Sequence, residues 1–311
     1  MKGKFEMKKY FLSFADSRLH RSLKRIIYQA ENMAFFDECY GLNEKNLPVE
    51  FRSQFKDQLF PGSRGYGYWS WKPEIINNIL DKIDFGDGLI YVDAGCHLNL
   101  NGRNRLKEYF DILEKTESGI VAFQANKPSP ENSTLIYDGR KLFDQSNYQW
   151  IKGDLFDHFR ARGKREYTHS QAIGAGIILI RKCNKSLKII DEWRQIIRND
   201  FNLIDDTPSV STNFDGFIEH RHDQAIFTLL CIKYKVKTLS SYELWMPKKF
   251  SLTSRFKPDW KTLKNFPIHA KRDRDFGFKE NFKVNFFFYT RKFQRVKKIV
   301  SAYLKIRGCT R

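Results

Sequence analysis

A single acidic residue ends one of the most apolar stretches of the chain. Residues 89–92 read Leu-Ile-Tyr-Val, and Asp93 follows them directly, before a small-residue turn at Ala94-Gly95. Such a run predicts a buried strand. In open α/β sheets, ligands bind beyond the carboxyl ends of the strands. A carboxylate at that edge can reach a metal ion, a ribose or a cation that holds phosphate; the alternative is a residue that only caps a turn.

Lys72 stands in an aromatic and glycine-rich segment, YGYWSWKP (66–73). The flat rings of Tyr68, Trp69 and Trp71 suit a sugar or a uracil ring. A lysine ammonium beside them meets phosphate as a point charge. The segment has no regular period, so we expect a loop, with Pro73 as the first residue of a helix. The alternative is that these rings pack one side of the core.

Two further pairs of residues lie where elements begin. Gly174 and Gly176 open an apolar strand, and glycines there indicate a close approach of the backbone. Asp223 and Gln224 follow two histidines at the start of an apolar helical stretch. A carboxylate at that position is a candidate general base toward an acceptor hydroxyl, or a sugar-binding group. The alternative is an acidic residue that caps the helix.

Alternating strands and helices must position these residues. Strands are expected near 8–14, 89–92, 119–123, 171–182 and 235–240, and helices near 19–33, 73–83, 102–116, 186–198 and 217–231. This order predicts an α/β fold, with a mostly parallel sheet and helices on both faces. Asp16 follows the first strand, where it can meet a nucleotide base or ribose, or cap the next helix. The polar segments 124–147 and 203–216 are expected to be surface loops.

Several motif classes are missing. The sequence has no GxGxxG or GxxxxGKS motif at a strand-to-helix turn, no GxSxG elbow and no HExxH. The usual dinucleotide and triphosphate fingerprints are therefore missing, as are many hydrolase signatures. The five cysteines are scattered, with no CxxC pair, which predicts reduced thiols in a cytosolic setting.

The order of the motifs resembles a known family. FAD (14–16), GYGYWSWKP (65–73), YVDAGC (91–96), GAGIILIR (174–181), HRHDQ (220–224) and IHAKR (268–272) occur in sequence. The set resembles the GT-A class of nucleotide-sugar glycosyltransferases, especially bacterial enzymes that build lipopolysaccharide and capsule chains, over most of residues 8–275. The resemblance implies a Rossmann-type GT-A fold. It also implies that Asp16, Trp71, Lys72, Asp93, Gly174, Gly176 and Lys271 bind the donor.

The resemblance also raises the question of a metal. In GT-A enzymes the strand that carries Asp93 normally ends in Asp-x-Asp, whose carboxylates hold a divalent cation. Here the sequence is Asp93-Ala94-Gly95, so the second carboxylate is missing. Mn²⁺ or Mg²⁺ would need further ligands, for which His97 and His269 are the candidates. Alternatively, Lys72, Lys271 and Arg272 supply the positive charge without a metal.

Basic residues concentrate at the end of the chain. Residues 281–311 hold nine Lys or Arg and no acid, about half of the net charge of +19. Apolar residues recur there at helical spacing, which predicts an amphipathic helix on an anionic membrane surface. A basic helix packed on its own domain is the alternative. No stretch approaches the ~20 apolar residues of a membrane span. We therefore expect a catalytic domain at 1–280 and a membrane-surface tail at 281–311, in a cytoplasmic protein on the inner face of the cell membrane.

The leading hypothesis is a glycosyltransferase. It would move a sugar from a nucleotide donor, with UDP expected, to a glycan or lipid-linked glycan acceptor in surface polysaccharide synthesis. A basic nucleic-acid-binding protein is a second hypothesis, but no RNP-type, helix-turn-helix or zinc-finger pattern is present, so no nucleic-acid partner is expected. A third is a degenerate glycosyltransferase that acts as a scaffold.

Overall fold

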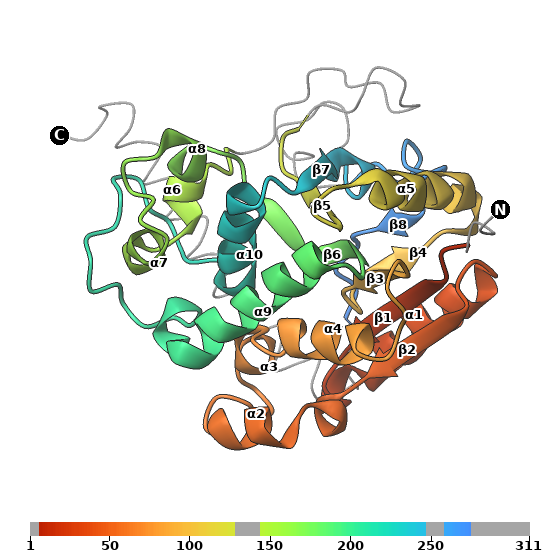
Figure 1. Cartoon of the computed structure of the whole chain (residues 1–311), viewed down its shortest axis with the longest axis horizontal. Coiled ribbons are helices and arrows are strands. Elements are labelled where there is room, and N and C mark those ends of the chain that lie inside the picture. The colour runs from red at the N-terminus through yellow and green to blue at the C-terminus, as the bar shows by residue number, and fades with distance from the viewer. Residues whose placement is uncertain (1–5, 128–143, 247–257, 275–311) are drawn as a thin grey trace.

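Six strands form one sheet at the centre of the molecule. The computed structural model describes residues 6–127, 144–246 and 258–274. The strand order is β2-β1-β3-β6-β5-β7 (Figure 1). The strands are β1 (Lys9–Phe14), β2 (Glu38–Leu42), β3 (Gly88–Val92), β5 (Ile120–Gln124), β6 (Ile173–Arg181) and β7 (Lys237–Ser240). Neighbouring strands are parallel except at β6, which runs antiparallel to both β3 and β5. The predicted α/β class and mostly parallel sheet are confirmed.

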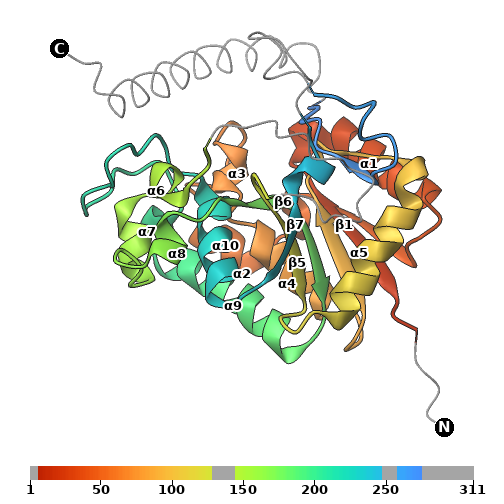
Figure 2. The ribbon, with the colours of Figure 1, turned by 90° about the horizontal axis from the view of Figure 1, so that it is seen from above.

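Helices cover both faces of this sheet (Figure 2). On one face lie α4 (Lys72–Leu80), α9 (Asn184–Asn199) and α10 (His222–Lys233), and on the other α1 (His20–Asn32) and α5 (Arg103–Lys115). The alternation of side chains along β3 explains why its run is apolar throughout. Leu89 and Tyr91 pack with the first group of helices, and Ile90 and Val92 with the second.

Several shorter strands and helices lie outside the six-stranded sheet and its covering helices. β4 (His97–Leu98) and β8 (Ile268–His269) form a separate antiparallel pair. Short helices α6, α7 and α8 lie to one side of the sheet, near α10 (Figure 1). The remaining helices are α2 (Val49–Gln54), α3 (Gly65–Tyr68), α6 (Asn147–Trp150), α7 (Gly153–His158), α8 (Arg165–Thr168), and the 3₁₀ turns η1 (Ser17–Leu19), η2 (Glu44–Asn46), η3 (Leu100–Gly102), η4 (Phe201–Leu203) and η5 (Ser241–Glu243).

Some sequence expectations need correction. α4 begins at Lys72, so Pro73 is its second residue rather than its first. β2 was not predicted, because its residues are half-exposed and lack an apolar run. The antiparallel direction of β6 was also not predicted, since a strand buried on both faces has the same apolar pattern in either direction. Most of 124–147 and the whole of 281–311 lie outside the described residues.

Two general expectations concern cysteines and membrane spans. The four cysteines in the described ranges, Cys39, Cys96, Cys183 and Cys231, are all free thiols. Among the helices of the described ranges, none combines the length and apolar character needed to cross a bilayer.

Candidate active site

The ends of β1 and β3 meet at a change of direction in the sheet. The two strands are parallel neighbours, but the chain continues from β1 to β2 on one side and later enters β3 on the other. This is a topological switch point, where open α/β sheets bind ligands. Asp93 directly follows β3, and Asp16 follows β1. The antiparallel β6 begins at the same edge, where the Asp93 backbone N–H donates to the Gly176 carbonyl at 2.8 Å.

Three charged side chains from different elements meet at this edge. Lys72 Nζ, at the start of α4, lies 2.6 Å from Asp223 Oδ2 and 3.5 Å from Asp93 Oδ1. The side chains of Lys72 and Asp223 are 3% and 7% exposed, whereas that of Asp93 is 40% exposed. Asp93 is therefore the member of this cluster that a ligand can reach, with Lys72 and Asp223 behind it.

Burial and charge set the protonation of this cluster. Burial raises the pKa of the Asp223 carboxyl to about 6, against the opposing effect of Lys72. Burial lowers the pKa of the Lys72 ammonium, but Asp223 and Asp93 raise it by more, so that its pKa lies above its ordinary value. Lys72 therefore stays charged at neutral pH. A single buried cation is shared by two carboxylates, of which one faces outward.

Tyr91 and Gly176 fix the position of the Asp93 carboxylate. The Tyr91 hydroxyl donates to Asp93 Oδ1 at 2.6 Å. A Cβ atom on Gly176 would lie 2.7 Å from Asp93 Oδ2, so glycine is needed there for the observed orientation. At Gly174 a Cβ would meet only the Phe123 carbonyl oxygen, at an ordinary 3.6 Å. Tyr91 was not predicted as a site residue, although residues two apart in a strand share a face.

The aromatic segment has an unusual backbone. Tyr66, Tyr68 and Trp69 all have positive φ, between 52° and 60°. Such conformations cost free energy and gather at functional sites. Trp71, predicted to bind the donor, is only 4% exposed and stacks on Phe14 with ring centroids 3.9 Å apart. Trp71 therefore packs in the core, as the alternative to ring stacking on a ligand predicts, and its indole lies behind the site.

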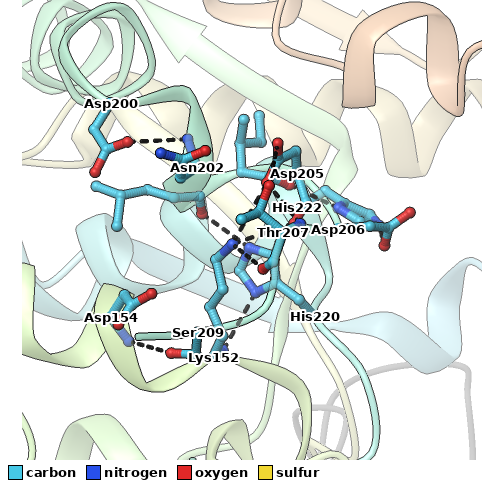
Figure 3. Close-up of polar contacts among 12 residues, drawn as sticks. Lys152, Asp154, Asp200, Asn202, Asp205, Asp206, Thr207, Ser209, His220 and His222 are labelled. Atoms are coloured by element: carbon cyan, nitrogen blue, oxygen red, sulfur yellow. Dashed lines mark hydrogen bonds and ion pairs between the residues drawn. The ribbon is translucent and has the colours of Figure 1, made fainter. Parts of the chain in front are cut away.

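A loop beside the start of α10 is held by buried polar groups (Figure 3). The ring nitrogens of His220 and His222 contact the carbonyls of residues 203 and 204 at 2.9 and 2.7 Å. Lys152 Nζ donates to the carbonyls of residues 205 and 207. Burial lowers the pKa of both histidines, that of His222 to about 3, so both rings are neutral. These contacts fix the backbone that leads into Asp223, and Gln224 follows it half-buried in the first turn.

Asp16 is engaged by its neighbour. The Arg18 guanidinium donates to both oxygens of the Asp16 carboxylate, at 3.0 and 2.8 Å. The carboxylate also accepts from the Arg18 backbone N–H and caps the 3₁₀ turn η1. Asp16 therefore caps a helical turn, which was the alternative to contact with a nucleotide base or ribose. It nevertheless lies at the same sheet edge as Asp93.

The predicted metal ligands are not gathered. His97 Nε2 faces the Asp273 carboxylate at 3.0 Å, and His269 Nε2 faces the Leu263 carbonyl at 2.9 Å. Within the ranges that the structure describes, no three His, Cys, Asp or Glu side chains form a group that could hold a metal ion. In addition, the Lys72 ammonium lies between the two carboxylates that could bind a cation jointly. The donor set of Asp93, His97 and His269 therefore does not fit a divalent metal.

Comparison with known proteins gives a distant likeness. No family model matches the chain, and no curated protein matches its sequence. Three of the similar solved structures are glycosyltransferases. One is involved in glycosylation of the major capsid of the virus PBCV-1 (11% identity, TM-score 0.41, covering 84% of this chain and 91% of that one). Another is the galactosyltransferase LgtC with donor and acceptor sugar analogs (14%, 0.38, 85% and 86%). The third is mouse xyloside xylosyltransferase 1 (10%, 0.38, 75% and 84%).

Glycosyltransferases thus occur among the solved structures to which the chain is similar. At these identities and TM-scores, the function has to be inferred from the residues of the site itself.

Proposed function

We propose that this chain is a glycosyltransferase that takes a sugar from a nucleotide-sugar donor. The observation that carries the proposal is the outward-facing Asp93 at the switch point, with the Lys72 ammonium and Asp223 buried behind it. A switch point is the place where α/β sheets bind nucleotides. The order of motifs from 14–16 to 268–272, which resembles GT-A enzymes, supports the same activity.

The reaction assigns distinct tasks to these groups. The bond between the sugar carbon and the diphosphate oxygen breaks, and its electron pair leaves with the diphosphate. An acceptor hydroxyl oxygen forms the new bond to that carbon, and its proton passes to the departing diphosphate. Asp93 Oδ2 accepts a hydrogen bond from a hydroxyl of the sugar or ribose. Asp223 holds Lys72 in place, and Gln224, which is less buried than Asp223, is the candidate for contact with the acceptor.

The donor and acceptor follow from the sequence resemblance. We propose a UDP-sugar as donor and a glycan or lipid-linked glycan of a surface polysaccharide as acceptor. The basic tail at 281–311 would bind the anionic inner face of the cell membrane. Sedimentation of the full chain with anionic vesicles tests the tail. We expect that sedimentation to be lost when the five basic residues of 291–298 are replaced by Gln, and unchanged sedimentation would contradict the membrane role.

A donor-consumption assay tests the activity itself. The full chain is incubated with UDP-, GDP- and dTDP-sugars, and release of the nucleoside diphosphate by slow hydrolysis is measured. We expect hydrolysis of one donor class. Asp93→Asn is expected to lower it about 100-fold, as loss of one hydrogen bond to a charged group does. Asp111→Asn, an exposed residue on α5, is the control and should not change the rate. A chain that neither consumes nor binds any of these donors would contradict the proposal.

A further inference from the structure

Residues 271–274 lie along the turn that follows β3. The Asp273 backbone N–H donates to the Gly95 carbonyl at 2.9 Å. A Cβ atom on Gly95 would lie 3.4 Å from the Arg272 Cα, so the two backbones are in close contact. The pairing of β4 with β8, which places His97 opposite His269, brings the late segment to this turn. A stretch about 180 residues further along the sequence thus borders the Asp93 turn.

Arg25 of α1 ties the two segments together. Its Nη2 atom donates to the carbonyls of Ala94 and Cys96, at 2.8 and 3.3 Å. Its Nη1 atom lies 3.4 Å from the Asp273 carboxylate, which His97 also contacts. Arg25 is therefore a positioning residue, because its own charge is used on these carbonyls and on Asp273.

The tied segment brings two further guanidinium groups to the site. Arg272 and Arg274 are solvent-exposed, and Arg272 has a φ of 55°, a strained conformation for a residue with a side chain. Arg274 directly follows Asp273, whose backbone N–H donates to the Gly95 carbonyl at 2.9 Å, so its backbone also borders the Asp93 turn.

The described side chains around the turn carry more positive than negative charge. Among the described residues discussed above, the basic side chains of the site and of 271–274 are Arg18, Arg25, Lys72, Lys271, Arg272 and Arg274, and the acidic ones are Asp16, Asp93, Asp223 and Asp273. Asp16 is paired with Arg18, Asp223 with Lys72 and Asp273 with Arg25. An anionic ligand would compensate the excess positive charge.

We infer that the donor diphosphate is held by the guanidinium groups of Arg272 and Arg274, in the role that a divalent cation has in enzymes with two motif carboxylates. This inference rests on the proposed glycosyltransferase activity. A planar guanidinium donates two parallel hydrogen bonds to phosphate oxygens. It needs no bridging carboxylate, which agrees with the missing second Asp and with the Lys72 ammonium between the remaining two. The open oxygen of Asp93 is then left for a sugar or ribose hydroxyl.

Calorimetric titration of UDP into the full chain tests this inference. We expect UDP to bind in EDTA, and added Mn²⁺ to leave the affinity unchanged. Arg272→Asn should weaken UDP binding about 10-fold, the loss of one charge-assisted hydrogen-bonded contact. Asn tolerates the left-handed conformation, so this variant removes the charge without adding strain. Arg272→Lys, which keeps the charge, should retain more affinity than Arg272→Asn.

A matched control comes from the same chain. Arg160 is also exposed and also has a positive φ, of 48°, but it lies in the turn after α7. Arg160→Asn should bind UDP as the wild type does. UDP binding that requires Mn²⁺, or that Arg272→Asn together with Arg274→Gln leaves unchanged, would overturn the inference while the glycosyltransferase proposal stands. Absence of UDP binding under every condition, together with no donor consumption, would overturn both.

Discussion

Two carboxylates of this protein have the same kinds of partner but opposite surroundings. Glu243, in the turn after β7, accepts two bonds from Arg105 at 2.9 and 2.8 Å, and one from the Tyr109 hydroxyl at 2.6 Å. Its side chain is fully buried. Asp93 also has a tyrosine hydroxyl at 2.6 Å and a basic side chain nearby.

The difference lies in what remains open. Asp93 is 40% exposed, and its Oδ2 atom points toward the space that Gly176 leaves by having no Cβ. Its lysine partner is 3.5 Å away and is closer to Asp223. Glu243 has both oxygens bonded, so it joins α5 to the end of the sheet. We therefore expect the closed carboxylate to serve the fold and the open one to serve a ligand.

The largest effect on stability is expected from replacing Lys72, the buried cation behind Asp93. Lys72→Met leaves the buried Asp223 without its partner, so the free energy of unfolding should fall by about 3–5 kcal/mol. Urea unfolding followed by circular dichroism measures this. Donor hydrolysis should also be lost.

A compensating change separates fold from function at that site. Lys72→Met combined with Asp223→Leu removes both buried charges, which is often neutral for stability. We expect most of the stability to return but not the activity. A double variant that regains donor hydrolysis would show that the site does not depend on its charges.

The closed carboxylate should behave in the opposite way. Glu243→Gln breaks a buried ion pair, and we expect it to lower the free energy of unfolding by about 3 kcal/mol. Donor hydrolysis, measured well below the unfolding midpoint, should stay at the wild-type rate. Loss of activity in a folded Glu243→Gln protein would contradict the expectation that Glu243 serves only the fold.

The glycines at the start of β6 offer a smaller and sharper test. Gly176→Ala places a Cβ 2.7 Å from Asp93 Oδ2 and should displace that carboxylate. Donor hydrolysis is then expected to fall about 10-fold or more, because small misplacements of a reacting group are costly. Gly174→Ala is the matched control, since its Cβ meets only an ordinary 3.6 Å contact. Equal rates for the two variants would contradict the role given to Gly176.

A further prediction concerns the pH dependence of stability. Burial raises the pKa of Asp223 to about 6, above the ~3.9 of an unfolded chain. The folded state therefore binds this proton more tightly, so the stability from this group is present below about pH 4 and lost as the pH rises through about 6. Between pH 4.5 and 7, wild type should lose about 2 kcal/mol relative to Asp223→Asn in urea unfolding. A pH-independent difference would show that the carboxyl has its ordinary pKa.

Part of this site could be predicted from the sequence. The apolar run before Asp93 and the alternation of elements place that residue, with Asp16, at the carboxyl ends of parallel strands. Which side chains pair is decided by packing between distant segments. The position of Lys72 between Asp93 and Asp223 depends on how the antiparallel β6 and the start of α10 pack against α4, and that packing leaves no local signal in the sequence.

The position of residues 271–274 could not be predicted from local sequence either. Residues 271–274 reach the turn after β3 only through the β4 and β8 pair, whose two-residue strands are too short for a pattern to predict. Arg274 and Arg25 were therefore missed, whereas Arg272 was noted as a source of positive charge and Lys271 both as such a source and, by resemblance, as a donor-binding residue.

Titration of UDP into Asp93→Asn in the presence of EDTA tests the central claim most directly. If Asp93 faces a hydroxyl of the transferred sugar, which UDP lacks, and the diphosphate is held by arginines, the variant should bind UDP at least as tightly as wild type, because one negative charge near the diphosphate is removed. If Asp93 instead holds the diphosphate through a metal, wild type should bind UDP only after Mn²⁺ is added, and the variant should not bind it at all. That second result would contradict the account.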